Sequence, residues 1–308
     1  MASSVKYMNM KLSVVQATKN EAENIARNLD SVKDIAYEMI VVDEYSTDDT
    51  KKIAEEHGAK VYLEPHHDIF HITKQKAIDR AKGDWILQID TDEVVTSELA
   101  EEIKKVLKGE EIKINDPKKK ILFDRHQSLL EQRDLPADAT HQALQAGGKL
   151  GTDTGEIVAY FIPRVNMFLN KPLIHAGVYP DGVIRLFKRG KAWLPCKSVH
   201  EQMVIEGKVG WLNQNILHYD SPTLSKYLWR LNRYTDLHAQ ELKDSKLKKN
   251  VLSFFKFIFL LPTYYFLLRY VRHGGYKDGV NGFLWSFFSA LHFPIAYFKY
   301  VTDNKGYK

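Results

Sequence analysis

Short apolar runs alternate with amphipathic segments through the first hundred residues, and this alternation constrains the fold more than any other feature of the sequence. The apolar runs predict strands at residues 12–17, 39–42, 61–63 and 85–89. The segments between them have helical spacing and predict helices at 21–32, 48–57 and 73–81. Strands that alternate with helices form a parallel sheet with helices on both faces. We therefore predict a Rossmann-like α/β fold, in which ligands bind at the carboxyl ends of the strands.

Acidic residues stand where two of these strands end. Asp43 ends the second strand and Asp90 ends the fourth, so both are expected at the same edge of the sheet. Asp90 also opens the run Asp90-Thr91-Asp92-Glu93. If this run stays extended, Asp90 and Asp92 point the same way and can converge on one hard cation, while Glu93 points away. The alternative is a helix N-terminus, where acidic side chains are also favoured.

Composition sets broad limits on the protein class. A chain of 308 residues with 44% hydrophobic residues can bury one large core or two moderate ones. Its one cysteine, Cys196, excludes an internal disulfide framework and is typical of a reducing compartment. The first ten residues lack the apolar segment of a signal peptide. We expect a protein of the cytosol or of the cytoplasmic face of the membrane.

The pattern changes after a predicted helix at 97–108, for which Ser97 is a plausible cap. Residues 109–156 are rich in charge, glutamine, alanine and glycine, and they predict an insertion. Strand-like runs resume at 157–162, 183–187, 199–205 and 216–219, and a long helix is predicted at 223–242. The predicted divisions are 1–108 and 157–222 as the two halves of the α/β domain, 109–156 as the insertion, and 223–308 as a helical region.

The last region is basic and aromatic. Residues 223–308 contain 14 lysines and arginines against 5 acidic residues. Its apolar segments, 251–271 and 282–301, are interrupted by lysine, histidine and proline, so neither has the roughly 20 uninterrupted apolar residues of a confident transmembrane helix. This pattern predicts helices that lie in the interface of an anionic membrane, and it is too apolar for a nucleic-acid-binding arm. The alternative is a helical subdomain or oligomer contact that is buried against protein.

Two ordered sets of motifs extend along most of the chain. In the first half they are VVQATKNE at 14–21, IVVDEYSTDDT at 40–50, GDW at 83–85 and DTDE at 90–93. In the second half they are YPD at 179–181, RLF at 185–187, VHE at 199–201, HY at 218–219 and GYKDG at 275–279. Together these motifs resemble family 2 glycosyltransferases of the GT-A fold. The second set is similar to the branch that contains lipopolysaccharide inner-core β-glucosyltransferases.

The resemblance implies inverting transfer of a glucose-like hexose from a nucleotide diphosphate sugar, with uridine as the expected base. The implied acceptor is a lipid-anchored saccharide of the cell envelope. An all-oxygen site of this kind suits Mn²⁺ or Mg²⁺. In the family pattern Asp92 is the direct metal ligand, Asp90 contacts the ribose or a metal-bound water, and His218 completes the coordination. The alternative for His218 is a strand-end histidine that bonds to the backbone.

Further residues match the family's catalytic and donor positions. Glu201 stands where the family has the base that removes the acceptor proton, and the alternative is a surface glutamate. Ser46 and Asp48 are predicted to cap the following helix rather than to touch the donor. Lys74 is a candidate for the diphosphate, with a solvated helix face as its alternative, and Arg185 for a phosphate. The implied nucleoside contacts are Thr18, Glu21 and Asp43.

Two other functions compete with this interpretation. A polyprenyl-phosphate sugar synthase would share the donor half but would not need VHE at 199–201 followed by HY at 218–219. A catalytically silent nucleotide-sugar-binding or membrane scaffold would not need Asp90, Asp92 and Glu201 together. The predicted partners are a nucleotide sugar, a lipid-linked acceptor and an anionic membrane, with no nucleic acid, and self-association stays open.

Overall fold

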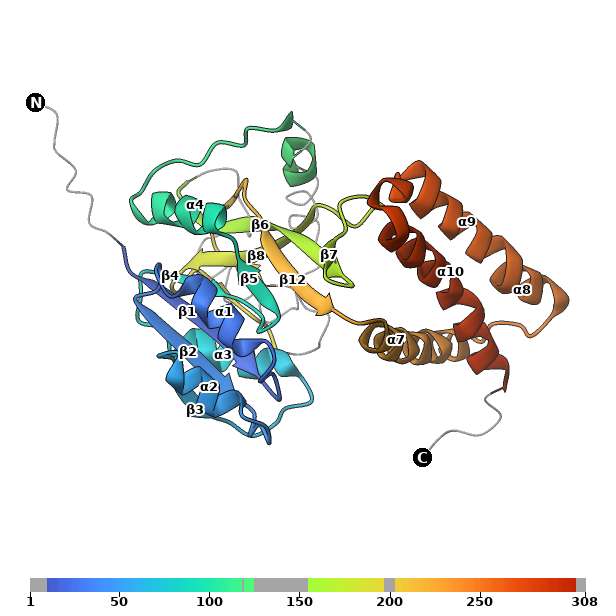
Figure 1. Cartoon of the computed structure of the whole chain (residues 1–308), viewed down its shortest axis with the longest axis horizontal. Helices are drawn as coiled ribbons and strands as arrows, with labels where there is room; N and C mark the ends of the chain where they lie inside the picture. Colours follow the sequence, from blue (N-terminus) through green and yellow to red (C-terminus); the bar gives the residue numbers. More distant parts are fainter. Residues whose placement is uncertain (1–9, 118, 125–154, 197–202, 303–308) are drawn as a thin grey trace, which may run out of the picture. The chain divides into compact units, whose positions relative to one another are not determined.

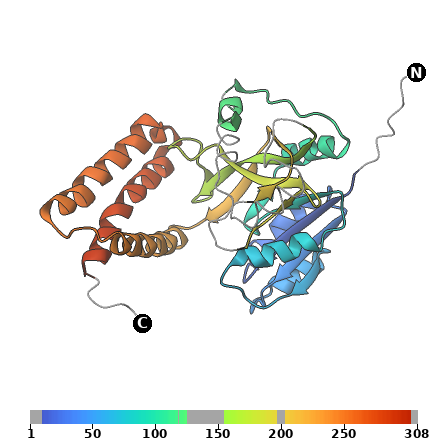
Figure 2. The same cartoon turned by 180° about the vertical axis from the view of Figure 1, so that it is seen from behind.

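The protein consists of two compact units that exchange segments of the chain. The computed structural model describes residues 10–117, 119–124, 155–196 and 203–302. Unit 1 comprises Met1–Arg164 and Pro180–His218, and unit 2 comprises Val165–Tyr179 and Tyr219–Lys308. Figures 1 and 2 show the sheet of unit 1 and the helices of unit 2 from opposite sides. The chain therefore passes between the units three times, after Arg164, after Tyr179 and after His218.

The first half of unit 1 is the predicted parallel α/β arrangement. Four strands lie in the order β3-β2-β1-β4, with parallel pairing throughout. They are β1 (Leu12–Thr18), β2 (Glu38–Asp43), β3 (Lys60–Leu63) and β4 (Trp85–Gln88). The helices between them are α1 (Ile25–Val32), α2 (Thr50–Glu56) and α3 (Phe70–Asp79). The predicted alternation is confirmed, although α1 begins later than residue 21 because residues 22–24 form a turn.

The second half continues the same sheet with antiparallel strands. The order beyond β4 is β8 (Asp181–Lys188), β6 (Ile157–Phe168), β12 (Ile216–Ser221) and β5 (Glu93–Val95). Strand β8 is antiparallel to both of its neighbours, β4 and β6. The remaining short strands are β7 (Lys171–Pro172), β9 (Ala192–Trp193), β10 (Val204–Ile205) and β11 (Lys208–Trp211). The sheet is therefore mixed. Strand β8 lies in its middle, and its side chains stand next to the end of β4.

Alternating side chains of the strands fill two cores, one on each face of the sheet. Val15 and Ile86 pack with Ala77 of α3 on one face. Their chain neighbours Val14 and Leu87 pack on the other face, with residues of α4 (Ser97–Leu107). Because both faces of β1 and β4 are covered by hydrophobic layers, these strands read as continuous apolar runs. The cap of α4 is Thr96, whose hydroxyl accepts from Leu99 N, and not Ser97 as the sequence predicted.

Unit 2 is built from three long helical segments and residues 165–179. They are α7 (Leu224–Asp244), a continuous segment from Val251 to Arg272, and α10 (Gly279–Thr302). The middle segment consists of α8 (Val251–Phe255), η1 (Lys256–Leu260), α9 (Leu261–Leu267) and η2 (Leu268–Arg272), of which η1 and η2 are π-helical turns. One cluster joins all three helices through Leu242, Phe257 and Tyr297. Tight turning at η3 (Gly275–Asp278) requires Gly282, because a Cβ there would lie 1.9 Å from the Gly275 carbonyl oxygen.

The segment 251–272 differs from its prediction in being uninterrupted. Pro262 stands in the first turn of α9, and the π-helical turns on either side keep the helix continuous through Lys256 and Pro262. Among the described residues it is the helix that is long and apolar enough to cross a membrane, judged by length and composition. Helices that never cross a bilayer can also meet these criteria of length and composition.

A pair of histidines between α7 and α10 predicts a pH dependence of stability. His238 and His292 stack with their ring centroids 5.0 Å apart and share a 2.9 Å contact between ring nitrogens. Burial lowers the pKa of His292 to about 4 and also lowers the pKa of His238. The unfolded chain takes up these protons near pH 6.5, whereas the folded pair does so only at lower pH. Stability is therefore expected to fall as the pH drops from about 6.5 towards about 4.

The measurement is the melting temperature of the wild type and His292→Asn across this pH range. The wild type is expected to lose stability more steeply, because the substitution removes the group that only the unfolded state protonates. The control is His273→Asn, which changes an exposed histidine of the same unit outside this pair, and its slope is compared with that of the wild type. Parallel curves for the wild type and His292→Asn would contradict the assignment.

Candidate active site at the carboxyl edge of the sheet

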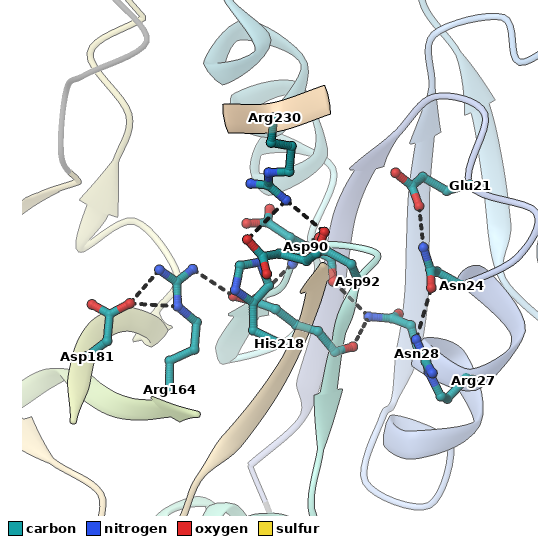
Figure 3. A network of polar contacts seen from close by, with 12 residues as sticks. Glu21, Asn24, Arg27, Asn28, Asp90, Asp92, Arg164, Asp181, His218 and Arg230 are labelled. Carbon is teal, nitrogen blue, oxygen red and sulfur yellow. Dashed lines mark hydrogen bonds and ion pairs between the residues drawn. The ribbon is translucent and has the colours of Figure 1, made fainter. Parts of the chain in front are cut away.

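The acidic run after β4 forms a closed turn. Glu93 N donates to the Asp90 carbonyl at 2.9 Å, and Asp90 N donates to Glu93 Oε2, also at 2.9 Å. From α1, the Asn28 side-chain amide donates to the carbonyls of Asp90 (2.9 Å) and Glu93 (2.7 Å). The expectation of an extended run is therefore wrong, because Glu93 folds back onto the amide of Asp90. Figure 3 shows Asp90 and Asp92 close to His218, at the turn that follows β4.

Asp90 is held between two cations. Lys74 of α3 forms an ion pair with Oδ1, and Arg185 Nη2 of β8 lies 2.5 Å from Oδ2. The register of β8, in which Leu186 pairs with Leu87, brings Arg185 to Gln88, whose Oε1 accepts a 2.9 Å hydrogen bond from it. Burial alone would raise the pKa of Asp90, but Arg185 and Lys74 outweigh it and hold the pKa well below its ordinary value. Asp90 is thus an anion whose charge is balanced inside the protein.

Glu93 links Asp90 to a second arginine. Its side chain is fully buried, and Oε1 accepts from Arg185 at 2.7 Å and from Arg164 of β6 at 3.5 Å. Arg164 also donates to Asp181 at 2.6 and 2.9 Å. Neither Asn28 nor Arg164 is among the residues predicted from the sequence, because both come from elements whose ends carry no acidic motif. The signal that could have found them is the charge imbalance of the buried carboxylates, which require cationic or amide partners.

Asp92 lies beside His218. Strand β12 pairs with β5 so that His218 stands opposite Glu93, and its Nε2 is 3.4 Å from Asp92 Oδ2. Both side chains are largely buried. Burial would lower the pKa of His218, but the hydrogen bond and charge of Asp92 raise it above the ordinary value. The structure thus brings together two residues that lie more than a hundred positions apart in the chain.

The Asp92–His218 pair suits a divalent cation that a diphosphate also binds. Among the described residues, no group of three or more histidine, cysteine or acidic side chains could hold a metal ion by itself. A carboxylate oxygen and an imidazole nitrogen are nevertheless the two donors that Mn²⁺ accepts readily, and Mg²⁺ accepts the carboxylate. If no residue outside the described ranges contributes, the remaining ligands would come from phosphate oxygens or water. The donor set therefore fits a metal that binds together with a nucleotide.

The ends of β1 and β2 present polar atoms that need a partner. Thr18 pairs with Asp43 across the two strands. Thr18 Oγ1 and Asp43 Oδ2 are buried and have no hydrogen-bond partner among the described residues. Asp43 uses only its other oxygen, which accepts from Ser46 N at 2.6 Å. Buried polar atoms without partners are costly, so this edge is organised for a ligand with hydrogen-bonding groups.

Hydrogen bonds within and between the neighbouring loops fix the conformation of this edge. Glu21 accepts a 2.7 Å hydrogen bond from the Asn24 side chain at the start of α1 (Figure 3). Asp48 accepts from Thr50 N at 3.0 Å, but the N-cap of α2 is Asp49, so the prediction that Asp48 caps this helix is wrong. Ser46 instead accepts from Asn20 N at 2.8 Å, which ties the loop after β2 to the loop after β1. The prediction that Ser46 caps α2 is therefore wrong.

The predicted base, Glu201, lies outside the described residues, as does His200. Its role stays a prediction. Of the other predicted site residues, the structure groups Lys74, Asp90 and Arg185 in one ion-pair network, Asp92 with His218, and Thr18 with Asp43. The described contacts of Arg185 are with Gln88 and two carboxylates, so its predicted role as a phosphate ligand stays a prediction as well.

Comparison with known proteins finds a matching family model and relatives that are similar over most of the chain. Residues 13–120 match the model of a family described as glycosyl transferase family 2. An uncharacterised glycosyltransferase of Rickettsia conorii is 28% identical over 298 residues, which are 96% of this chain and 90% of that protein. The lipopolysaccharide core biosynthesis glycosyltransferase LpsC of Rhizobium meliloti is 24% identical over 286 residues, 89% of this chain and 85% of LpsC.

Among solved structures, glucosyl-3-phosphoglycerate synthase of Mycobacterium tuberculosis is similar over a short stretch. It covers 28% of this chain and 34% of that chain, at 28% identity and a TM-score of 0.26. The sequence matches extend much further, and they coincide with the strands that form the carboxyl edge described above. Residues 13–120 thus resemble a glycosyl transferase family 2 domain, in a chain whose relatives over most of its length are named glycosyltransferases.

Proposed function

We propose that this protein is a metal-dependent inverting glycosyltransferase that acts at the cytoplasmic face of the membrane. It would move a glucose-like hexose from a UDP-sugar to a lipid-anchored saccharide of the cell envelope. The observation that supports this most is the division of the aspartate turn into a charge-balanced Asp90 and an Asp92 that lies beside His218. The similarity to LpsC, whose name refers to the lipopolysaccharide core, supports the class of acceptor.

The nucleoside would bind at the ends of β1 and β2. Thr18 Oγ1 and Asp43 Oδ2 are buried atoms that a base or ribose can satisfy, and Glu21 lies in the adjoining loop. Asp90 would accept from the ribose while Lys74 and Arg185 keep it ionised. Lys74 is the cation of this network that we assign to the diphosphate, because Arg185 is already shared between Asp90 and Glu93. In this arrangement the reactive end of the donor would point towards Asp92.

Asp92 and His218 would hold Mn²⁺ or Mg²⁺. When bound, such an ion stabilises the charge that develops on the departing diphosphate. The geometry of this chain serves that step through Glu93, whose two hydrogen bonds fix the turn that presents Asp92. His218 must be neutral to donate a nitrogen lone pair to a metal. Because Asp92 raises the pKa of His218, protons and the metal ion compete for this pair.

Glu201 is the residue that we assign to general base. It would accept the proton of the acceptor hydroxyl as that oxygen forms a bond to the anomeric carbon. The bond from this carbon to the diphosphate breaks at the same time, and the electron pair leaves with the diphosphate. Attack from the face opposite the leaving group inverts the configuration at the anomeric carbon.

The test is a transfer assay over a panel of nucleotide sugars, with a lipid-linked saccharide and a polyprenyl phosphate as acceptors. Glu201→Gln is expected to slow transfer by about 10²- to 10⁴-fold while donor binding is retained, because only proton removal is lost. Glu206→Gln changes a nearby glutamate of the same stretch and should leave the rate unchanged. Transfer to the polyprenyl phosphate alone would favour the synthase, and donor binding without any transfer would favour the silent scaffold.

A further inference from the structure

The helix from Val251 to Arg272 exposes an apolar face that no described residue covers. Only 11% of its most apolar window is buried. Phe255 and Phe259 are 56% and 55% exposed, and their rings contact each other with centroids 5.5 Å apart. We call this the outer face. Its members are Leu252, Phe255, Phe259, Leu260, Tyr264, Leu267 and Val271.

The charge around the outer face has one sign. Residues 245–302 contain eight lysines and arginines and a single acidic residue, Asp278. The Asp278 side chain is 8% exposed and pairs with His175 Nδ1 at 2.7 Å. It also accepts from the backbone N of Ile174 and of His175. The solvent-facing charge of this part of the chain is therefore positive, which complements an anionic surface.

The carboxyl end of the helix is fixed to the segment that joins the two units. The Ala176 N donates to the His273 carbonyl at 3.0 Å, and Arg269 donates to the Ala176 carbonyl at 3.3 Å. Just beyond, the Asn281 amide donates to the Phe168 carbonyl at 2.6 Å. Residues 165–179 continue directly into the chain of unit 1 at both ends. This end of the helix must therefore stay on the side of the membrane that holds unit 1.

The amino end of the helix follows α7, and its packing with α7 also limits how the helix can lie in a membrane. The three helices of unit 2 pack together through Leu242, Phe257 and Tyr297, so they would have to cross a membrane together (Figures 1 and 2). Midway along α7, Arg233 is exposed, and so is Asp236, whose side chain is 60% exposed. Charged side chains are strongly disfavoured in hydrocarbon. The helix is long enough to span a bilayer, yet its packing partners oppose crossing.

We propose that the helix from Val251 to Arg272 lies in the plane of an anionic membrane leaflet, with its outer face inserted and both of its ends on the side of unit 1. The partner is a bilayer that contains acidic phospholipid. Phe255 and Phe259 enter the acyl boundary, and Lys248, Lys249 and Arg272 meet the headgroups at the two ends. The role of membrane binding in sugar transfer rests on the proposed lipid-linked acceptor. The binding itself requires neither a sugar donor nor turnover.

Labelling from one side of a sealed vesicle distinguishes a helix in the plane from one that spans. Cys196→Ser removes the only cysteine. Lys248→Cys and Lys277→Cys then place one thiol at each end of the helix, in separate full-length proteins. With vesicles of phosphatidylglycerol and phosphatidylcholine, both thiols should react with an impermeant maleimide that is added outside. Protection of either thiol until detergent is added would overturn the proposal.

Binding of the full-length protein to the same vesicles tests the outer face. The double variant Phe255→Ser, Phe259→Ser should have a partition coefficient lower by roughly 30-fold or more, because two exposed rings no longer enter the apolar region of the bilayer. Tyr37→Ser removes an equally exposed ring from unit 1, at 55% exposure, and should bind like the wild type. Vesicles of phosphatidylcholine alone should bind the wild type at least about 10-fold less. Unchanged binding of the double variant, or equal binding to both vesicle types, would contradict the proposal.

Transfer to a water-soluble acceptor saccharide separates this proposal from the proposed function. The double variant should keep that activity, because its substitutions lie outside unit 1. Vesicle binding without transfer by any variant would contradict the proposed function alone. Transfer without vesicle binding would contradict the membrane proposal alone.

Discussion

Replacing Asp92 with asparagine is expected to lower the rate of sugar transfer on the order of 10³-fold. Asparagine keeps the shape of the side chain but loses the charge that would hold a divalent cation beside His218. The diphosphate would then leave without electrostatic stabilisation. The measurement is kcat with saturating donor and acceptor at a fixed Mn²⁺ concentration.

A matched control separates this effect from a general loss of negative charge. Asp49 stands at the start of α2, and its side chain makes no capping hydrogen bond. Asp49→Asn should therefore leave the rate unchanged. If Asp92→Asn retained the wild-type rate with its dependence on Mn²⁺, the assignment of Asp92 as a metal ligand would be wrong.

The second large effect is expected from Arg185→Met, which should lower the free energy of unfolding by about 3–5 kcal/mol. The substitution leaves Asp90 and Glu93 buried without the cation that both share. Lys74 can still balance Asp90, but among the described residues the only ion pair left to Glu93 would be the longer one with Arg164. The measurement is urea denaturation of the wild type and the variant at neutral pH.

Lowering the pH gives this prediction an internal check. In the variant, protonation of Asp90 and Glu93 removes the unpaired negative charge. The difference in free energy of unfolding between Arg185→Met and the wild type should therefore become smaller at acidic pH. Arg189→Met changes an arginine of the same part of the chain, which donates to the Gly83 carbonyl and not to a carboxylate, and it should cost much less. A loss below about 1 kcal/mol for Arg185→Met, in the range of an ordinary exposed pair, would contradict the role of Arg185.

The parallel half of the fold and the edge that carries the site could be predicted from the sequence. Strands β1, β2 and β4 are apolar runs because both faces of the sheet are covered, and this signal is local. The positions of Asp43 and Asp90 at one edge follow from parallel pairing, which the structure confirms. His218 could be placed only through the family resemblance, because its strand comes far later in the chain.

The conformation of the aspartate turn could not be predicted from the sequence. It depends on Asn28 from α1 and on Glu93 folding back, and neither contact leaves a periodic signal. For the same reason the sequence predicts the surroundings of Asp90 only in part: it indicates phosphate contacts for Lys74 and Arg185, whereas in the structure both pair with the Asp90 carboxylate. The continuity of the helix from Val251 to Arg272 was also missed, because π-helical turns let it pass Pro262.

The central claim is that Asp92 and His218 hold a divalent cation together with a nucleotide diphosphate, and calorimetric titration of UDP into the protein tests it most directly. We predict that UDP binds at least about 10-fold more tightly with Mn²⁺ than with a chelator, and that Asp92→Asn and His218→Asn each remove this difference. Equal affinity for UDP with Mn²⁺ and with the chelator, or an undiminished effect of Mn²⁺ in both variants, would contradict the claim.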